Sequence, residues 1–262
     1  MDYLPMGVVL HVPHHSTLIP LSLRDQFLLE PSELNREVVR MTDHLTLPLF
    51  AGESLSEQIV VAPVSRLVVD VERFPEDGDE PMSARGMGVI YTATADGFPL
   101  RRQMSHEERQ ILLADYYVPH HARLSAAVCT SLERNGQCLI IDAHSFPSQP
   151  LLYEDDQEAD RPDICIGTDK HHTPERVRAA FKMSFVNEGF SVLENRPFSG
   201  AVVPAPYFGS DRRVMSVMVE VNRGLYLDEM TGLANCEFES VSRRVRRACR
   251  IAIDLSLGKD DK

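Results

Sequence analysis

Residues of the kinds that bind metals or transfer protons gather at the ends of four apolar stretches of this chain. The stretches read GVVLHVPHH (7–15), RLVVDVER (66–73), CLIIDAHS (138–145) and VMSVMVEVNR (214–223). Their polar residues are His11, His14, His15, Asp70, Glu72, Arg73, Asp142, His144, Ser145, Glu220, Asn222 and Arg223. In open α/β sheets, ligands bind beyond the carboxyl ends of the strands. If the four stretches are parallel and adjacent strands, these residues meet at one edge of the sheet.

Imidazoles and carboxylates together are natural ligands of a catalytic zinc ion, which takes three protein ligands and leaves one position open for water. His14 and His144 are the best candidates, since each lies at the end of an apolar run where the backbone is rigid. Asp43, in the segment MTDHLT, is a candidate third ligand, and His11 and His15 are alternatives. We expect about one Zn²⁺ ion per chain at such a site.

Three acidic residues have expected roles around this metal. Asp70 can orient a ligand histidine by accepting its other ring N–H, and Asp142 is placed for a similar role. Glu220 lies inside an apolar run, where a carboxylate is costly to bury unless it is paired or functional. We interpret Glu220 as a general base that activates water and then protonates the leaving amine, with a pKa raised by burial. The alternative is an ion pair with a nearby arginine.

The sequence also offers groups that could hold a carboxylate-bearing substrate. Arg73 emerges from an apolar run beside Glu72, and its guanidinium can bind a carboxylate through two hydrogen bonds. Ser145, Asn195 and Arg223 are further candidates for substrate binding.

Composition and missing motifs exclude several classes of protein. The 262-residue chain has a net charge of -12 and no apolar run of 18 residues, so we expect neither a nucleic-acid partner nor a membrane partner. Five scattered cysteines, no CxxC pair and no signal-peptide pattern predict a cytoplasmic protein with reduced thiols. The sequences GxSxG, GxxxxGK[ST] and GxGxxG do not occur, which disfavours an α/β-hydrolase, a P-loop and a dinucleotide site. The oligomeric state stays unknown.

Apolar runs alternate with amphipathic segments along the chain. We expect strands at 7–12, 58–62, 66–72, 138–142, 190–194 and 214–222, and helices at 31–50, 105–135, 174–188 and 237–256, with loops at 74–88 and 150–173. Pro119 is expected to bend or split its helix, and His120 and His121 after it either reach the site or lie on the helix face. This pattern predicts an α/β fold with a mainly parallel or mixed central sheet flanked by helices, in a single domain over 1–262.

Several of these segments, in order along most of the chain, resemble the N-formylglutamate amidohydrolase family. VVLHVPHHSTLIP resembles that family's strand and PHSG motif, with His14 on the motif histidine. MTDHLT resembles its DTDW segment, with Asp43 on the second Asp, and VSRLVVDVERFPED resembles SRxxVDxNR. IDAHSFPSQP resembles DxHS, while ENRPFSGAVV and VMVEVNRGLYLDE resemble NxPFxGG and QxExxRxLYxDE.

The resemblance implies a phosphorylase/hydrolase-like fold related to the zinc carboxypeptidase and aspartoacylase group. It implies zinc-dependent hydrolysis of the amide bond of an N-acylated amino acid such as N-formylglutamate, a small carboxylate-bearing amide, with a place in amino-acid metabolism such as histidine degradation. His14 and His144 would bind the metal, Glu220 would act as base, and Arg73 would hold the substrate carboxylate.

Two departures from the family motifs change the expected pocket. His15-Ser16 stands for Ser-Gly, and Glu72 stands where Asn is usual. An extra acid would repel an acidic substrate unless an arginine neutralises it. The alternatives are therefore an amidase or carboxypeptidase-like enzyme for a different acyl-amino acid or peptide, and a relative that binds a small acid without turnover.

Overall fold

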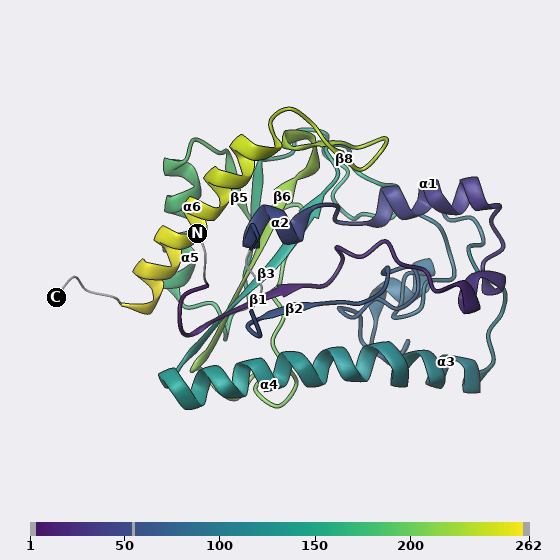
Figure 1. Ribbon diagram of the computed structural model, residues 1–262, viewed down its shortest axis with the longest axis horizontal. Coiled ribbons are helices and arrows are strands. Elements are labelled where there is room, and N and C mark those ends of the chain that lie inside the picture. The colour runs from purple at the N-terminus through teal and green to yellow at the C-terminus, as the bar shows by residue number, and fades with distance from the viewer. Residues whose placement is uncertain (1–3, 54–55, 259–262) are drawn as a thin grey trace.

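A six-stranded mixed sheet lies at the centre of the fold (Figure 1). The structure is a computed structural model that describes residues 4–53 and 56–258. The strands, in spatial order, are β2 (Ile59–Val61), β1 (Val8–Val12), β3 (Cys138–Phe146), β6 (Val214–Asn222), β4 (Ile164–Gly167) and β5 (Val192–Glu194). The first four are parallel, whereas β4 and β5 run antiparallel to β6. The expected α/β class with a mainly parallel, mixed sheet is confirmed.

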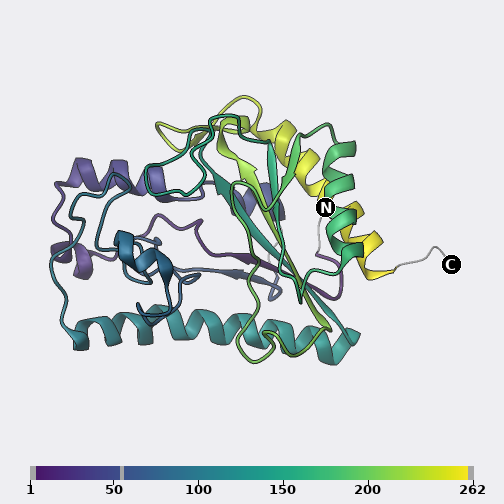
Figure 2. The same cartoon turned by 180° about the vertical axis from the view of Figure 1, so that it is seen from behind.

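Helices cover both faces of this sheet. They are α1 (Pro31–Met41), α2 (Thr46–Ala51), α3 (His106–Leu112), α4 (Val118–Asn135), α5 (Glu175–Asn187) and α6 (Phe238–Leu257). Figures 1 and 2 show α5 and α6 side by side at one end and α4 along the opposite side, continued by α3. A two-stranded ribbon, β7 (Leu227–Asp228) with β8 (Leu233–Ala234), follows β6. Among the helices in the described ranges, none is long and apolar enough to cross a membrane.

The two faces of the sheet differ along the strands. Alternate residues such as Leu10, Ile141 and Val219 pack with α2, α5 and α6 in the largest hydrophobic cluster. The other face packs Val9 and Ile140 against α4. Because side chains alternate along a strand, this second face continues toward the carboxyl ends with a polar group: His11, Asp142, His144 and Glu220. The apolar half anchors α4, and the polar half is available for chemistry.

A second lobe packs beyond the carboxyl ends of β1 and β2, on the right of Figure 1. It is built from α1, the end of α3 and the segment 62–104, around its own hydrophobic cluster. The sequence predicted a strand over 66–72, and this prediction is wrong. Leu67, Val68 and Val69 are buried in the lobe as successive turns, because an apolar run alone does not distinguish a strand from a buried turn.

Three further boundaries differ from the sequence predictions. The helix expected over 31–50 is interrupted at 42–45, where Leu45 takes a left-handed conformation with φ of 61°. The helix expected over 105–135 contains a π-helical turn, Leu113–Tyr117, just before Pro119. Strand β4 lies inside the predicted loop 150–173, where the short buried run Ile164-Cys165-Ile166 interrupts a polar region.

Candidate active site

Two buried imidazoles form the centre of the candidate site. His14 follows β1 after Pro13, and His144 lies near the carboxyl end of β3, where it is the register partner of Glu220 on β6. The ring centroids of the two histidines are 5.1 Å apart, and each residue is only 3% exposed. The sequence predicted that both lie just beyond strand ends. However, β3 continues to Phe146, so the hydrogen bonds between strands fix the backbone of His144.

Asp43 lies in the break between α1 and α2. Its backbone N–H donates to the carbonyl of His14 at 3.0 Å, and the Thr46 hydroxyl donates to the carbonyl of Asp43 at 2.8 Å. These bonds turn the carboxylate toward the imidazoles, with Oδ2 3.2 Å from His144 Nδ1 and 3.8 Å from His14 Nδ1. The helix break therefore brings Asp43 to the histidines that lie far from it in sequence.

Two other carboxylates contact the opposite nitrogens of the rings. Asp70 Oδ1 lies 2.8 Å from His14 Nε2, and Asp142 Oδ1 lies 3.0 Å from His144 Nε2. A carboxylate in this position fixes the tautomer and orientation of a metal-binding histidine. Both carboxylates are buried, at 0% and 2% exposed for Asp70 and Asp142.

The two histidines could hold a metal ion on either side of their rings. His14 Nδ1 is buried and has no hydrogen-bond partner among the described residues. A second grouping, on the Nε2 side, adds Glu72, whose Oε2 lies 3.1 Å from His144 Nε2 and 4.0 Å from His14 Nε2. Because Asp70 and Asp142 already accept hydrogen bonds on that side, the free lone pair of His14 favours the Nδ1 side with Asp43.

The electrostatics of the site favour ionised side chains despite their burial. Burial alone would raise the pKa of Asp43, but the neighbouring imidazoles of His14 and His144 and the charge of Arg223 bring the pKa well below its usual value. Burial likewise opposes protonation of His144, but the carboxylates of Glu72 and Asp142 outweigh it and raise its pKa well above the usual value. The proton on His144 therefore balances part of the negative charge of Glu72 and Asp142.

Glu220 stands beside His144 on the neighbouring strand. It is 7% exposed, and its Oε2 has no hydrogen-bond partner within the described part of the chain. Burial raises the pKa of Glu220 to about 8, against the opposing charge of His144. A carboxyl group with a pKa near neutrality can both accept and return a proton, which is what general acid–base chemistry requires.

These groups open onto a cavity of about 160 Å³. Arg73 lines it, and its buried Nε has no hydrogen-bond partner among the residues described. The nearest carboxylate oxygens to its guanidinium, on Asp70 and Glu80, lie at 3.9 and 4.0 Å, beyond hydrogen-bond distance. Glu72 and Glu220 line the same cavity. An anion entering the cavity would therefore meet the Arg73 guanidinium, which has a free donor among the described residues.

The other candidate substrate-binding residues lie in different positions. Arg223 is buried, with NH2 2.7 Å from Asp43 Oδ1 and Nε 3.1 Å from Ser145 Oγ, so its guanidinium positions Asp43. Ser145 lines the cavity, and its backbone N–H donates to Asp43 Oδ2 at 3.2 Å. Asn195 is not brought to the cavity: it is exposed beside the edge strand β5 and bonds Thr168.

Sequence reasoning missed two residues that support Asp70. Arg66 holds Asp70 Oδ2 with Nε at 3.1 Å and NH2 at 2.7 Å, and the Tyr91 hydroxyl donates to the same oxygen at 2.7 Å. Burial alone would raise the pKa of Asp70, but Arg66 and His14 bring the pKa well below its usual value. Arg66 precedes Asp70 by four residues. Side chains at this spacing meet in a helix but not in a strand, so the predicted strand gave no sign of their contact.

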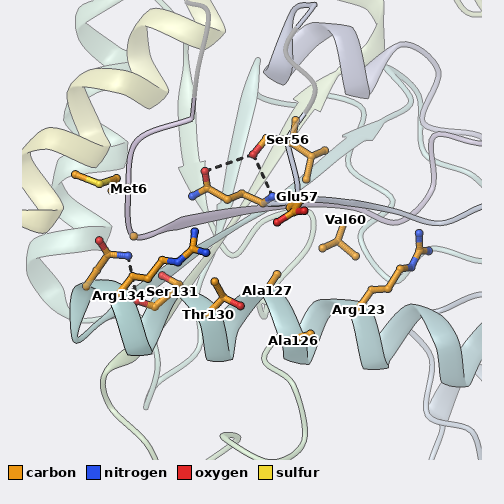
Figure 3. A pocket seen from close by; sticks show the side chains of 14 residues that line it. Met6, Ser56, Glu57, Val60, Arg123, Ala126, Ala127, Thr130, Ser131 and Arg134 are labelled. Carbon is orange, nitrogen blue, oxygen red and sulfur yellow. Dashed lines mark hydrogen bonds between the residues drawn. The ribbon is translucent and has the colours of Figure 1, made fainter.

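A larger hollow of about 650 Å³ lies elsewhere, between α4 and the edge strand β2. Figure 3 shows Thr130, Ser131 and Arg134 of α4 facing the segment that carries Ser56 and Glu57. Its described lining residues include no histidine or cysteine. Size alone therefore does not identify the candidate active site, because the imidazoles and buried carboxylates line the smaller cavity.

Comparison with known families decides the classification. A family model described as N-formylglutamate amidohydrolase matches residues 6–227, which include His14, Asp43, His144 and Glu220. The chain belongs to the N-formylglutamate amidohydrolase family. The resemblance noted in the sequence is thereby confirmed.

Two relatives in this family have the name N-formylglutamate deformylase. The protein from Pseudomonas aeruginosa is 30% identical over 190 residues, covering 70% of this chain and 69% of its own length. The protein from Pseudomonas putida is 27% identical over 232 residues, covering 86% and 83%. A crystal structure of N-formylglutamate amidohydrolase from Ralstonia eutropha matches with a TM-score of 0.79 at 21% identity, covering 97% of this chain and 95% of that one. This last match confirms the fold.

Proposed function

We propose that this family member is a metal-dependent amidohydrolase that removes the formyl group from N-formylglutamate or a closely similar N-acyl amino acid. The observation that carries the proposal is the buried Nδ1 of His14, which faces Asp43 and has no hydrogen-bond partner in the described part of the chain, with His144 Nδ1 3.2 Å from the same carboxylate oxygen. The names of the two Pseudomonas relatives support the substrate class.

His14, His144 and Asp43 would hold a zinc ion. When bound, this ion would polarise the amide carbonyl and make a water molecule more acidic. Asp70 and Asp142 keep the two rings oriented through their Nε2 atoms, while Arg223 holds Asp43 in place. The nearby positive charge would also lower the pKa of Glu220, so that its carboxylate is ionised near neutral pH.

Glu220 would move the proton of the reaction. Its carboxylate takes a proton from water as the oxygen attacks the formyl carbon, and then gives that proton to the nitrogen as the C–N bond breaks. The products are formate and the free amino acid. The pairing of Glu220 with His144 on adjacent strands keeps the base beside the metal ligands throughout.

Arg73 would bind the substrate's carboxylate. Its guanidinium has a buried Nε with no hydrogen-bond partner among the described residues and lies at the wall of a cavity of about 160 Å³, which suits a small amide. Glu72 lines the same cavity and is 19% exposed. This acid would repel a second substrate carboxylate. Its position favours an N-acyl amino acid with a less acidic side chain as the second candidate substrate.

A substrate panel tests this function. The zinc-loaded protein is offered N-formylglutamate, N-formylglutamine, N-formylmethionine and N-acetylglutamate, and release of the free amine is measured. We expect the zinc-loaded protein to hydrolyse at least one formylated amino acid. After zinc is removed by a chelator, we expect no hydrolysis. Absence of turnover on the whole panel by a zinc-loaded protein would instead identify a binding protein without catalysis.

A further inference from the structure

A second polar cluster lies behind His144, on the face of the sheet that α4 covers. His11 and Asp142 are register partners on β1 and β3, with Nδ1 and Oδ1 2.8 Å apart. Glu72 reaches the same nitrogen from the lobe, with Oε1 at 3.6 Å. His120 of α4 completes the cluster, with its Nε2 2.8 Å from His11 Nε2. The hydrolysis proposed above assigns no role to His11 or His120.

The spacing of these atoms suits a bound cation. One donor atom from each of His11, Glu72 and Asp142 lies within 4.8 Å of the others. The 3.6 Å between Glu72 Oε1 and His11 Nδ1 is too long for a hydrogen bond. However, two ligands that are each about 2.1 Å from one tetrahedral ion lie about 3.4 Å apart. The 2.8 Å between His11 Nδ1 and Asp142 Oδ1 is a hydrogen bond, which a bound ion would replace as the two atoms move apart.

The charge of the cluster calls for a cation. Asp43 and Asp70 are paired with Arg223 and Arg66, respectively. By contrast, no arginine or lysine in the described ranges forms an ion pair with Glu72 or Asp142, whose charged contacts are all histidines. Buried carboxylates are normally paired or bound to a metal. Asp142 is buried and Glu72 is 19% exposed, and within the described ranges both have only histidines as positively charged partners.

His120 provides the support that a ligand histidine needs. If the lone pair of His11 Nδ1 faces an ion, the proton of His11 lies on Nε2 and donates to His120 Nε2. His120 is fully buried, on the same face of α4 as Leu124 and Val128, which pack against the sheet. The packing of α4 thus fixes the acceptor that sets the tautomer of His11.

We propose that His11, Asp142 and Glu72 form a second site for a divalent cation such as zinc, next to the ion of the hydrolase site. The second ion would neutralise Glu72 and Asp142, whose oxygens lie 3.1 and 3.0 Å from His144 Nε2. It would thereby fix the two acids that contact the shared histidine. This site does not require that the protein be a deformylase.

Zinc stoichiometry tests the second site. Purified full-length protein is stripped with a chelator, saturated with Zn²⁺ and desalted, and bound zinc is measured by elemental analysis. We expect two ions in the wild type, one in His11→Asn and Glu72→Gln, and two in the control His171→Asn, which removes an imidazole outside the cluster. Asp43→Asn should lose the other ion and keep one. Thermal unfolding checks that each variant is folded.

The alternative results overturn the proposal in distinguishable ways. One ion in the wild type and in both cluster variants would leave only the hydrolase site. Two ions retained in folded Glu72→Gln would place the second ion elsewhere. If the wild type binds one ion and His11→Asn binds none, the single ion lies in the cluster. That result would contradict the metal site proposed for hydrolysis as well. If His11→Asn does not fold, Glu72→Gln decides alone.

Discussion

The sheet and the lobe each supply half of the hydrolase site, and they hold their side chains by different means. His144 and Glu220 are fixed by the hydrogen-bond ladder between β3 and β6. Asp43, Asp70 and Arg73 come from turns, and Asp43 and Asp70 are held by side-chain partners such as Arg223 and Arg66. The sheet provides His144, Glu220 and Asp142, which contacts His144, whereas the loops provide Asp43, Asp70, which contacts His14, and Arg73.

The largest effect is expected from the sheet. Glu220→Gln removes the proton-transferring group and keeps its shape, so kcat should fall by about 10³-fold or more while zinc content is unchanged. Steady-state kinetics and elemental analysis of the same preparation measure both quantities. A variant with normal kcat would remove Glu220 from the reaction.

The proposed metal ligand in the break between α1 and α2 should show a different signature. Asp43→Asn removes one charged donor and leaves Arg223 buried without its carboxylate partner. The affinity of the hydrolase site for zinc should fall by about 100-fold or more, since even outer partners of metal ligands cost 10–100-fold. Competition with a zinc indicator measures the affinity. Unchanged affinity would mean that the ion lies on the Nε2 side, with Glu72.

The substrate anchor should affect binding more than chemistry. Arg73→Gln removes the guanidinium, so KM for a formyl amino acid should rise by about 10-fold or more, with a smaller change in kcat. The matched substrate is the corresponding formyl amino-acid amide, which lacks the carboxylate and should be affected little by the substitution. An equal loss for both substrates would contradict a carboxylate contact.

The smallest effect concerns stability and its pH dependence. In the metal-free fold the pKa of Glu220 is raised from 4.5 to about 8, so the fold favours the neutral acid. This contribution is complete below about pH 4.5 and is lost as the pH rises through about 8. Chelator-treated wild type should therefore lose stability relative to Glu220→Gln between about pH 5 and 9, measured by urea unfolding. A difference that does not vary with pH would contradict the raised pKa.

The same division between sheet and lobe explains what the sequence could predict. Continuous apolar runs identified β1, β3 and β6, and with them His14, His144 and Glu220, because strand periodicity is a local signal. The positions of Asp70 and Glu72 were inferred from a strand that does not exist. Their contacts depend on the packing of the 62–104 segment, which no local pattern records.

Two other features depend on long-range packing. The break at 42–45 that turns Asp43 toward the histidines follows from a hydrogen bond to the His14 carbonyl. His11 contacts His120 only because α4 packs on the sheet in a position that brings His120 next to β1. Neither contact has a signature in sequence spacing, so the alternatives for the third ligand and for His120 had to stay open until the fold was known.

The most direct test of the central claim is a crystal structure of the zinc-loaded protein with anomalous data collected on both sides of the zinc absorption edge. The account predicts a strong anomalous peak within about 2.2 Å of His14 Nδ1, His144 Nδ1 and Asp43 Oδ2. A zinc-loaded crystal with no peak between these three atoms would contradict the proposed catalytic centre.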